Sequence, residues 1–362
     1  MLLVYAYLAR PLNLINAVVL SPFFSGTLLF AVIRFPHVIQ DAIALISSKL
    51  PVGVEVPRSF LSMLRVALQA LLATSILRQI NQGLNTLAHN SWRVVSRSHW
   101  NWPNEIAVVT GASSGIGKDM AHKLADLGIQ VAVLDIQKPP KDLQSHQNIA
   151  FYQCDVTSTK SIAAAADSIR KELGHPTILI NNAGITLPTP ILQLPESFLR
   201  KIVGVNLMSL WFTTQEFLPH MIQMNKGHII TIASMASFIA LPRGADYSAT
   251  KAGALAFHES LACELKHFYK SPKILTTVVH PNFVSTPLIT DLEQHLKGAG
   301  MPILNSQYVA EQVVSQVKCG RGGQLIIGAP SVVSGIRGWP TWLQELFRDV
   351  LGKLEARSGG SR

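Results

Sequence analysis

Two different hydrophobic patterns divide the chain near residue 100. Before that position, long apolar stretches follow one another with few charges, whereas from Glu105 onward short apolar runs alternate with amphipathic segments. Short buried strands alternating with amphipathic helices are typical of βαβ units in a parallel sheet. The pattern therefore predicts an α/β domain over residues 101–335, built on a doubly wound parallel sheet of about seven strands. It also predicts an N-terminal helical membrane-anchoring region over residues 1–100 and a C-terminal amphipathic helix and tail over residues 336–362.

The N-terminal region contains two candidate membrane segments. Residues 12–33 carry no charged side chain, and about twenty apolar residues are what a helix needs to cross a bilayer. Pro22 could kink this segment or turn it into a re-entrant hairpin. Residues 60–77 are apolar but contain Arg65, so they fit a second span or an interfacial helix equally well. Residues 38–50, between the two, have a short amphipathic pattern.

Two other interpretations of residues 12–33 are less consistent with the sequence. A cleavable signal peptide would carry positive charge before its apolar region, and the first nine residues carry none. A core helix of a soluble domain would be expected to show a polar face, and this segment has none. A retained membrane anchor is the prediction.

The charge distribution supports a membrane surface rather than nucleic acid as a partner. The formal net charge is +10, and residues 1–100 hold eight Lys or Arg against two Asp or Glu. A basic, apolar segment suits an anionic membrane surface, and no basic stripe with interleaved aromatic residues is present to indicate nucleic-acid binding. Arg78, Arg93 and Arg97 follow the second apolar segment, and because an excess of positive charge marks the cytosolic side, the part of the chain after them is expected to lie in the cytosol.

The cysteines indicate neither a disulfide framework nor a metal site. Cys154, Cys263 and Cys319 are widely spaced and form no C-x-x-C pair. Such a sparse, odd set fits a reducing compartment, and no metal site is predicted.

A glycine-rich turn follows the first predicted strand, residues 106–110, and opens a helix. Glycines at such a turn let the backbone approach a pyrophosphate, whose charge is stabilised by the helix N-terminus. Serine hydroxyls could add contacts to the phosphates. The predicted cofactor-binding residues here are Gly111, Ser113, Ser114, Gly115, Ile116 and Gly117.

Asp135 ends the second predicted strand, residues 130–135. An acidic side chain at this place hydrogen-bonds the adenosine ribose and repels a 2′-phosphate. NAD(H) is therefore favoured, while the nearby Lys138 and Lys141 keep NADP(H) open as an alternative.

Tyr247 and Lys251 stand four residues apart and would share one face of a helix. A lysine cation beside a phenol favours the phenolate, so this pair is predicted to lower the pKa of Tyr247 and to transfer protons. Ser234 ends an apolar run that is typical of a buried parallel strand, and its hydroxyl would lie beside the tyrosine. Ser237 is a rival for the serine role, but the thirteen-residue gap to Tyr247 favours Ser234.

Taken together, these motifs resemble the short-chain dehydrogenase/reductase superfamily in order and spacing, over roughly residues 104–330. The resemblance rests on the glycine turn at 111–117, the run Asn181-Asn-Ala-Gly184, Asn206, Ser234, Tyr247 and Lys251. It implies a Rossmann-type fold and an NAD(P)-dependent oxidoreductase acting on CH–OH groups. It also implies a catalytic set of Asn206, Ser234, Tyr247 and Lys251, in which Asn206 holds a water molecule in a proton relay to Lys251.

The resemblance implies further cofactor contacts. In the family, Asp155 and Val156 lie against the adenine, Asn182, Ala183 and Gly184 line the cofactor, and Tyr247 and Lys251 also contact it. The backbone of Val284 and the hydroxyl of Thr286 would contact the carboxamide side of the nicotinamide. Asn282 stands where the superfamily usually has glycine. The run Pro281-Asn-Phe-Val284 is similar to that of membrane-associated retinol dehydrogenases and the type 11 17-beta-hydroxysteroid dehydrogenase group.

Two segments beyond the motifs bear on the substrate and on partners. Residues 288–304 are predicted to form a substrate lid, with an apolar wall of Leu288, Ile289, Leu292, Leu296, Met301 and Ile303. Ordinary packing of a short helix is the alternative. From Trp339 to Leu354, apolar residues recur at helical spacing. This stripe could pack on the domain, lie in a membrane interface near the active site, or form a homodimer contact.

Two functions follow as hypotheses. The first is a membrane-anchored oxidoreductase of the endoplasmic reticulum or lipid droplet, transferring a hydride between a nicotinamide cofactor and a retinoid, steroid or long-chain alcohol or ketone. The second is a catalytically silent, cofactor-binding scaffold at a membrane or lipid-droplet surface.

Overall fold

The computed structural model describes residues 19, 21–48, 59–94, 100–298 and 300–359. The chain divides into two compact units, Met1–Thr86 and Leu87–Arg362. Each is described separately.

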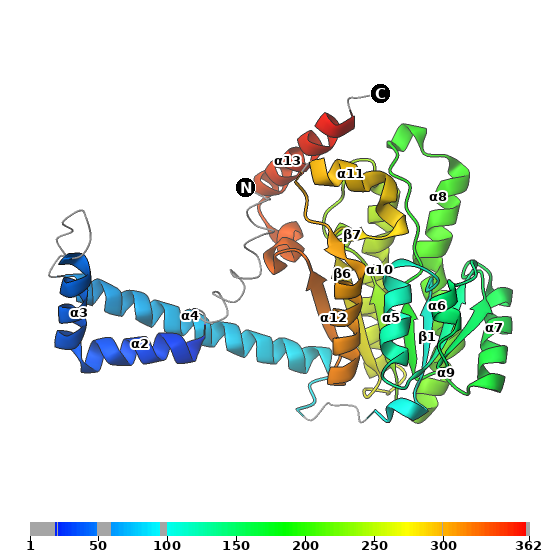
Figure 1. Cartoon of the computed structure of the whole chain (residues 1–362), viewed down its shortest axis with the longest axis horizontal. Helices are drawn as coiled ribbons and strands as arrows, with labels where there is room; N and C mark the ends of the chain where they lie inside the picture. Colours follow the sequence, from blue (N-terminus) through cyan, green and yellow to red (C-terminus); the bar gives the residue numbers. More distant parts are fainter. Residues whose placement is uncertain (1–18, 20, 49–58, 95–99, 299, 360–362) are drawn as a thin grey trace. The chain divides into compact units, whose positions relative to one another are not determined.

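The first unit contains helices α2 (Pro22–Arg34) and α3 (Pro36–Ser48) and most of α4 (Phe60–His89) (Figure 1). Pro22 lies in the first turn of α2, where its missing N–H costs nothing, so it begins a helix instead of kinking one. Residues 12–18 and 20 of the predicted first span lie outside the described residues. The chain bends by 101° between α2 and α3.

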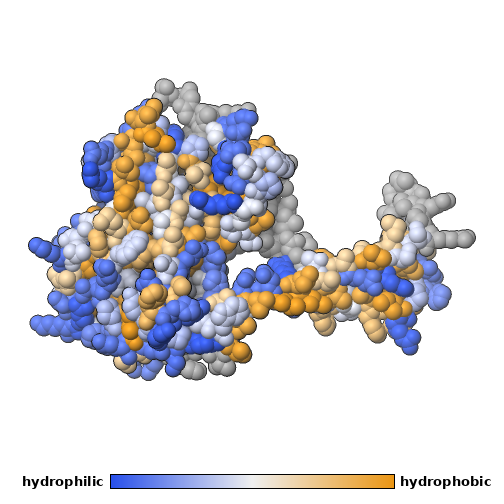
Figure 2. All heavy atoms as spheres, turned by 180° about the vertical axis from the view of Figure 1, so that it is seen from behind, coloured by the Kyte–Doolittle hydropathy of each residue, from blue (hydrophilic) through white to orange (hydrophobic). Residues whose placement is uncertain are grey.

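The second predicted segment is longer in the structure than the sequence pattern indicated. It continues from Phe60 to His89 as one helix of 30 residues, about 45 Å at 1.5 Å per residue. Among the described residues, α4 is the one helix long and apolar enough to cross a membrane alone, and the bent pair α2–α3 would make a second crossing if it acts as one span. Figure 2 shows apolar side chains along these helices.

The second unit is built on a parallel sheet of seven strands in the order β3-β2-β1-β4-β5-β6-β9. The predicted doubly wound parallel sheet is thus confirmed. Its strands are β1 (Ile106–Thr110), β2 (Gln130–Asp135), β3 (Ile149–Gln153), β4 (Ile178–Asn181), β5 (His228–Ile232), β6 (Leu275–Pro281) and β9 (Gly323–Ile327). A second, two-stranded sheet pairs β7 (Val284–Ser285) with β8 (Leu304–Asn305).

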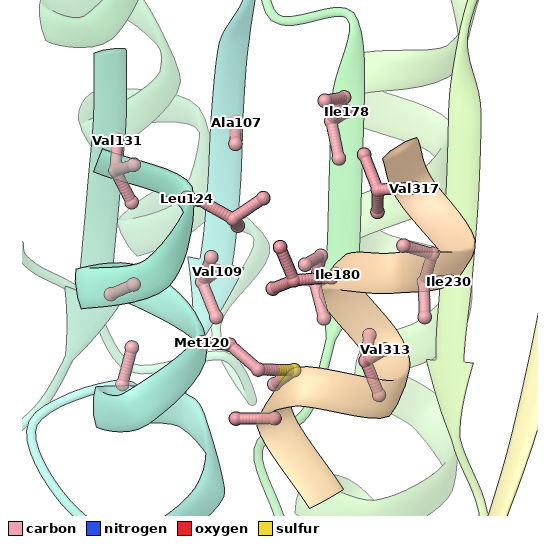
Figure 3. Packing of buried hydrophobic residues seen from close by; sticks show 14 of the residues in the cluster. Ala107, Val109, Met120, Leu124, Val131, Ile178, Ile180, Ile230, Val313 and Val317 are labelled. Carbon is pink, nitrogen blue, oxygen red and sulfur yellow. The ribbon is translucent and has the colours of Figure 1, made fainter. Parts of the chain in front are cut away.

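Helices cover both faces of the large sheet. One buried cluster packs α5 (Gly115–Ala125) and α12 (Ser306–Cys319) on one face. Figure 3 shows Met120 and Leu124 of α5 and Val313 and Val317 of α12 meeting side chains of β1, β4 and β5. The other cluster packs α7 (Thr159–Glu172), α9 (Ser209–Met224) and α10 (Ala245–His267) on the opposite face.

The remaining helical segments lie between or after these elements. They are η1 (Trp102–Asn104), α6 (Lys141–Gln144), η2 (Ile191–Gln193), α8 (Glu196–Val203), the π-helical turn η3 (Gly204–Met208), η4 (Met235–Ser237), η5 (Pro287–Ile289), α11 (Thr290–Gly298), η6 (Ser331–Gly338) and α13 (Thr341–Gly359).

The strand order fixes where a ligand site forms. The chain proceeds outward from β1 to β3 on one side and from β4 to β9 on the other, so the order reverses between β1 and β4. In open parallel sheets, ligands bind beyond the carboxyl ends of the strands at such a reversal. The ends of β1 and β4 are Thr110 and Asn181, which directly precede the glycine turn and the run Asn182-Ala-Gly184.

Candidate active site

A cavity of about 960 Å³ lies at the carboxyl ends of the strands, and most of the predicted site residues line it. The lining includes Gly111, Ser114, Gly115, Ile116, Asp135, Asp155, Val156, Asn182, Ala183, Gly184, Ser234, Tyr247, Lys251, Val284 and Thr286. Ser113, Gly117 and Asn206 are outside the lining but bond to or pack against residues in it. The structure thus brings together side chains that are up to 175 positions apart in the sequence, from Gly111 to Thr286.

The glycine turn is held closed by backbone contacts that leave no room for a side chain at Gly117. A Cβ atom there would lie 2.4 Å from the Gly111 carbonyl oxygen and 2.5 Å from the Asn182 side-chain nitrogen. The Asn182 amide donates hydrogen bonds to the carbonyl oxygens of Thr110 (2.9 Å) and Gly111 (3.0 Å). Asn182 therefore braces the turn as well as lining the cavity.

The start of α5 is suited to an anion. Ser114 is its N-cap residue, and the Ser114 side chain makes no capping hydrogen bond. Free N–H groups and the helix dipole favour negative charge at a helix N-terminus. The cradle of Gly111 and Gly115, both with φ above +50°, together with this terminus fits the pyrophosphate of a dinucleotide.

Asp135 and Ser113 are joined at the end of β2. One Asp135 oxygen accepts a hydrogen bond from the Ser113 N–H (2.9 Å), and the other accepts one from the Gln137 N–H (2.9 Å). The Ser113 hydroxyl donates to the Gln137 carbonyl oxygen (2.7 Å). Ser113 is thus engaged inside the protein, where it orients Asp135, whereas the sequence predicted a phosphate contact for its hydroxyl.

Asp155 and Val156 line the part of the cavity formed after β3. The Asp155 carboxylate accepts hydrogen bonds from the backbone N–H (2.9 Å) and the hydroxyl (2.7 Å) of Thr157. Val156 is buried and offers an apolar surface to the cavity.

Helix α10 places Tyr247 and Lys251 one turn apart, as predicted. The Lys251 Nζ lies 5.6 Å from the centroid of the Tyr247 ring and donates a hydrogen bond to the Ile232 carbonyl oxygen (2.8 Å). This carbonyl is available because β4 ends at Asn181, opposite Thr231, so Ile232 has a strand partner on the β6 side, Val279, but none on the β4 side.

Ser234, rather than Ser237, is the serine of the cavity. Its hydroxyl accepts a hydrogen bond from the Ala236 N–H (3.1 Å) and also hydrogen-bonds the Tyr247 phenol. The Ser237 hydroxyl is buried and donates to the Lys251 carbonyl oxygen (2.8 Å). Ser237 therefore holds η4 against α10 and is not part of the cavity lining.

Burial controls the protonation of the pair. It raises the pKa of Tyr247, although the hydrogen bond from Ser234 acts in the opposite direction. Burial also lowers the pKa of Lys251 to about 8. The predicted lowering of the Tyr247 pKa by Lys251 is thus not the net effect in this structure, because removal of the phenol from water outweighs it.

Asn206 lies in the π-helical turn between α8 and α9, a type of distortion that is frequent at functional sites. Its side-chain nitrogen donates to the Ile185 carbonyl oxygen (2.9 Å) and to the Thr250 hydroxyl (3.2 Å). Its side-chain oxygen accepts from the Ile185 N–H (2.8 Å). A methyl group added at Gly184 would lie 3.6 Å from both this oxygen and the Lys251 Nζ, so both atoms approach Gly184.

The remaining wall of the cavity is apolar. Leu288, Ile289, Leu292, Leu296 and Met301 of the predicted lid line it, whereas Ile303 does not. Sequence reasoning missed further wall residues: Met235, Ile239, Leu241, Val333, Phe347 and Leu351. The spacing of Phe347 and Leu351, four residues apart on α13, was the available signal, but it did not show that this face of the helix meets the cavity.

Comparison with known proteins identifies the family of the chain. The family model for short chain dehydrogenases matches residues 105–297. The chain is 42% identical over 203 residues to dehydrogenase RED2 of Cochliobolus heterostrophus, covering 56% of this chain and 76% of that protein. It is 32% identical over 242 residues to epidermal retinol dehydrogenase 2 of Mus musculus, covering 65% and 77% of the two chains.

Among solved structures, the fold is similar to that of 3-ketoacyl-(acyl-carrier-protein) reductase from Brucella melitensis complexed with NADH. The TM-score is 0.54 at 25% identity, over 62% of this chain and 96% of that one. The predicted branch is also confirmed, since the relatives include retinol dehydrogenases and estradiol 17-beta-dehydrogenase 11. With its glycine cradle, its serine, tyrosine and lysine in one cavity and a family match over 105–297, the chain belongs to the short-chain dehydrogenases and is an NAD(P)-dependent oxidoreductase.

Proposed function

We propose that this protein is a membrane-associated dehydrogenase or reductase that uses NAD(H) and acts on the hydroxyl or carbonyl group of a lipophilic substrate. The observation that carries the proposal is that one cavity holds both the polar group of Ser234, Tyr247 and Lys251 and an apolar wall of Leu292, Leu296 and Phe347. A reacting oxygen would meet the polar group while the hydrocarbon part of the substrate contacts the wall.

The residues have distinct roles in the proposed reaction. The Tyr247 phenol exchanges a proton with the substrate oxygen, and the Ser234 hydroxyl hydrogen-bonds the same oxygen. The Lys251 ammonium, next to the phenol, favours its ionised form during this exchange. Asn206 holds the backbone at Ile185, beside Gly184 and Lys251, and so orients the wall of the site. When bound, the nicotinamide cofactor supplies or accepts the hydride.

The preference for NAD(H) rests on Asp135. Its carboxylate lines the cavity at the end of β2 and is held in place by two backbone N–H groups. A fixed negative charge at this position binds a ribose hydroxyl and repels a phosphate. Lys138 and Lys141 follow it, and NADP(H) is the alternative that a direct comparison of the two cofactors would detect.

The proposed substrates are retinoids, steroids or long-chain alcohols and ketones. The apolar wall supports this class, and so do relatives named for retinol and estradiol. A cavity of this kind selects by apolar burial, worth about 25 cal/mol per Å².

Two apolar surfaces support a membrane location. Helix α4 has the length and composition of a span. Independently, the outer face of α13 exposes Trp342 (68%), Leu346 (55%) and Val350 (49%), while Phe347 and Leu351 of the same helix line the cavity. We therefore propose that the protein acts at the endoplasmic reticulum or lipid droplet, with its catalytic unit in the cytosol and membrane lipid as a partner.

The test is turnover by the full chain, purified in detergent micelles, of a panel of retinols, steroids, long-chain alcohols and the corresponding ketones, each with NAD(H) and NADP(H). We expect turnover of at least one lipophilic class. Tyr247→Phe is expected to lose about 10²-fold to 10⁴-fold in kcat and to keep cofactor binding. Cofactor binding without turnover of any panel member would instead support the silent scaffold.

A further inference from the structure

A buried histidine lies directly behind the serine of the active site. His280, on β6, has no exposed surface. Its Nδ1 lies 3.1 Å from the Ser234 carbonyl oxygen, and its Nε2 lies 3.2 Å from the side-chain nitrogen of Gln324 on β9. The ring also packs against Phe238, with 4.5 Å between the ring centroids.

The hydrogen-bond partners of His280, the Ser234 carbonyl and the Gln324 amide, indicate which nitrogen of the ring carries the hydrogen. A carbonyl oxygen only accepts hydrogen bonds and an amide nitrogen only donates them, so Nδ1 carries the hydrogen and Nε2 presents its lone pair to Gln324. Burial independently favours the neutral ring and lowers the pKa of His280 to about 4. The Ser234 carbonyl and the Gln324 amide therefore favour the same neutral tautomer, in which His280 donates to Ser234.

The position of His280 coincides with the end of the strand ladder. The last backbone bond from β5 to β6 runs from the Ala233 N–H to the Val279 carbonyl oxygen (2.8 Å). Pro281 follows on β6 and has no N–H to continue the ladder. Ser234 thus lies just beyond the regular pairing, at the start of η4, and the His280 ring supplies a donor that the backbone of β6 does not offer.

From this geometry we propose that His280, oriented by Gln324, is a positioning residue that sets the place of the Ser234 hydroxyl relative to Tyr247. The expected effect on kcat rests on the proposed function. The expected effect on the Ser234–Tyr247 hydrogen bond does not. His280 does not line the cavity and does not touch the substrate. It acts through the backbone of Ser234.

The first test measures the ionisation of Tyr247 and needs no turnover. The Ser234 hydrogen bond lowers the pKa of Tyr247, so its loss raises that pKa. Ultraviolet difference titrations measure this pKa, and the Tyr247→Phe variant identifies the Tyr247 signal. We expect both His280→Leu and Ser234→Ala to raise the pKa of Tyr247. His280→Gln, which retains a side-chain N–H, should restore part of the effect. An unchanged Tyr247 pKa in His280→Leu would overturn the proposal, whether or not a substrate has been found.

The second test uses kinetics and a matched control. His228 is equally buried on the neighbouring strand, hydrogen-bonded to Thr277 (2.8 Å), and at the opposite end of β5 from the cavity. We expect His280→Leu to lower kcat about tenfold to a hundredfold, as small misplacements of catalytic groups do, with the KM for cofactor unchanged. His228→Leu should lose stability but keep kcat.

Gln324→Leu provides a milder variant in case His280→Leu does not fold. It retains the histidine and its acceptor at Ser234 and removes only the donor to Nε2. We expect a smaller loss of kcat and, in ¹⁵N NMR spectra of the labelled ring, a minor population of the Nε2–H tautomer beside the Nδ1–H form that the Ser234 carbonyl still favours. An unchanged kcat in Gln324→Leu would contradict the orienting role of Gln324, and an equal kcat loss in His228→Leu would contradict the role of His280.

Discussion

Asn206 and Ile185 are joined by two hydrogen bonds in opposite directions. The Asn206 oxygen accepts from the Ile185 N–H at 2.8 Å, and the Asn206 nitrogen donates to the Ile185 carbonyl oxygen at 2.9 Å. The side-chain amide of Asn206 thereby makes the two hydrogen bonds that the backbone of a neighbouring strand would make. The pairing holds the chain after Gly184 next to Lys251, at the point where β4 has already ended.

Replacing Asn206 with Asp tests this pairing with almost no change in size. A carboxylate retains the acceptor for the Ile185 N–H but removes the donors to the Ile185 carbonyl and the Thr250 hydroxyl. We expect a loss of about 1–3 kcal/mol in the free energy of unfolding, typical of buried groups left unsatisfied, together with a lower kcat. Denaturant unfolding measures the first effect. Asn305→Asp, at the exposed N-cap of α12 where the side chain only accepts a bond from the Gln307 N–H, serves as the control and should change little, because Asp caps a helix as well as Asn does.

Asp135→Ser tests the basis of cofactor choice. Removing the carboxylate eliminates repulsion of a 2′-phosphate, so the ratio of kcat/KM for NADP to that for NAD should rise at least about tenfold, equivalent to 1.4 kcal/mol. The comparison is made with a single substrate at fixed ionic strength. A wild-type enzyme that already prefers NADP would contradict the role given to Asp135.

Lys251 should leave a signature in the pH dependence of stability. Its pKa is about 8 in the folded protein against an ordinary 10.4, so the unfolded chain binds more protons between these values and stability rises with pH there. The full cost of burying the charge, about 3 kcal/mol, applies below pH 8. The free energy of unfolding of the wild type, relative to that of Lys251→Met, should therefore increase from pH 8 to 10.5. A difference that is constant with pH would argue against a buried, pKa-shifted lysine.

The two faces of α13 should have separable roles. Phe347 lines the cavity, so Phe347→Ala should raise the KM for a long-chain substrate about tenfold or more, given ~1.5–3 kcal/mol for burying such a side chain. Trp342 faces outward, so Trp342→Ser should keep turnover in detergent and weaken binding of the protein to liposomes. Equal effects of both variants on KM would show that the outer face also contacts the substrate.

The site was partly visible in the sequence because its chemistry lies in short motifs whose geometry is local. The four-residue spacing of Tyr247 and Lys251 predicts that they share a helix face, and a glycine turn between a strand and a helix predicts a phosphate cradle. The apolar runs determined the strands for the same reason, since strands buried on both faces need continuous apolar sequence.

Other features depended on contacts between distant segments. Ser113 carries the same hydroxyl as Ser114, but only the fold shows that it is bonded to Gln137 beside Asp135. The pKa of Tyr247 was predicted from its neighbour Lys251 alone, whereas burial by the rest of the cavity decides the net direction.

The sequence by itself predicted the parallel sheet from its periodicity, the family from the order and spacing of its motifs, and Ser234, Tyr247 and Lys251 as the candidates for proton transfer. Tertiary structure alone decided which face of α13 closes the cavity, how Asn206 ties down Ile185, and that His280 and Gln324 support Ser234. These relationships join residues 21 to 100 or more positions apart, and no local pattern records which distant segments a folded chain will bring into contact.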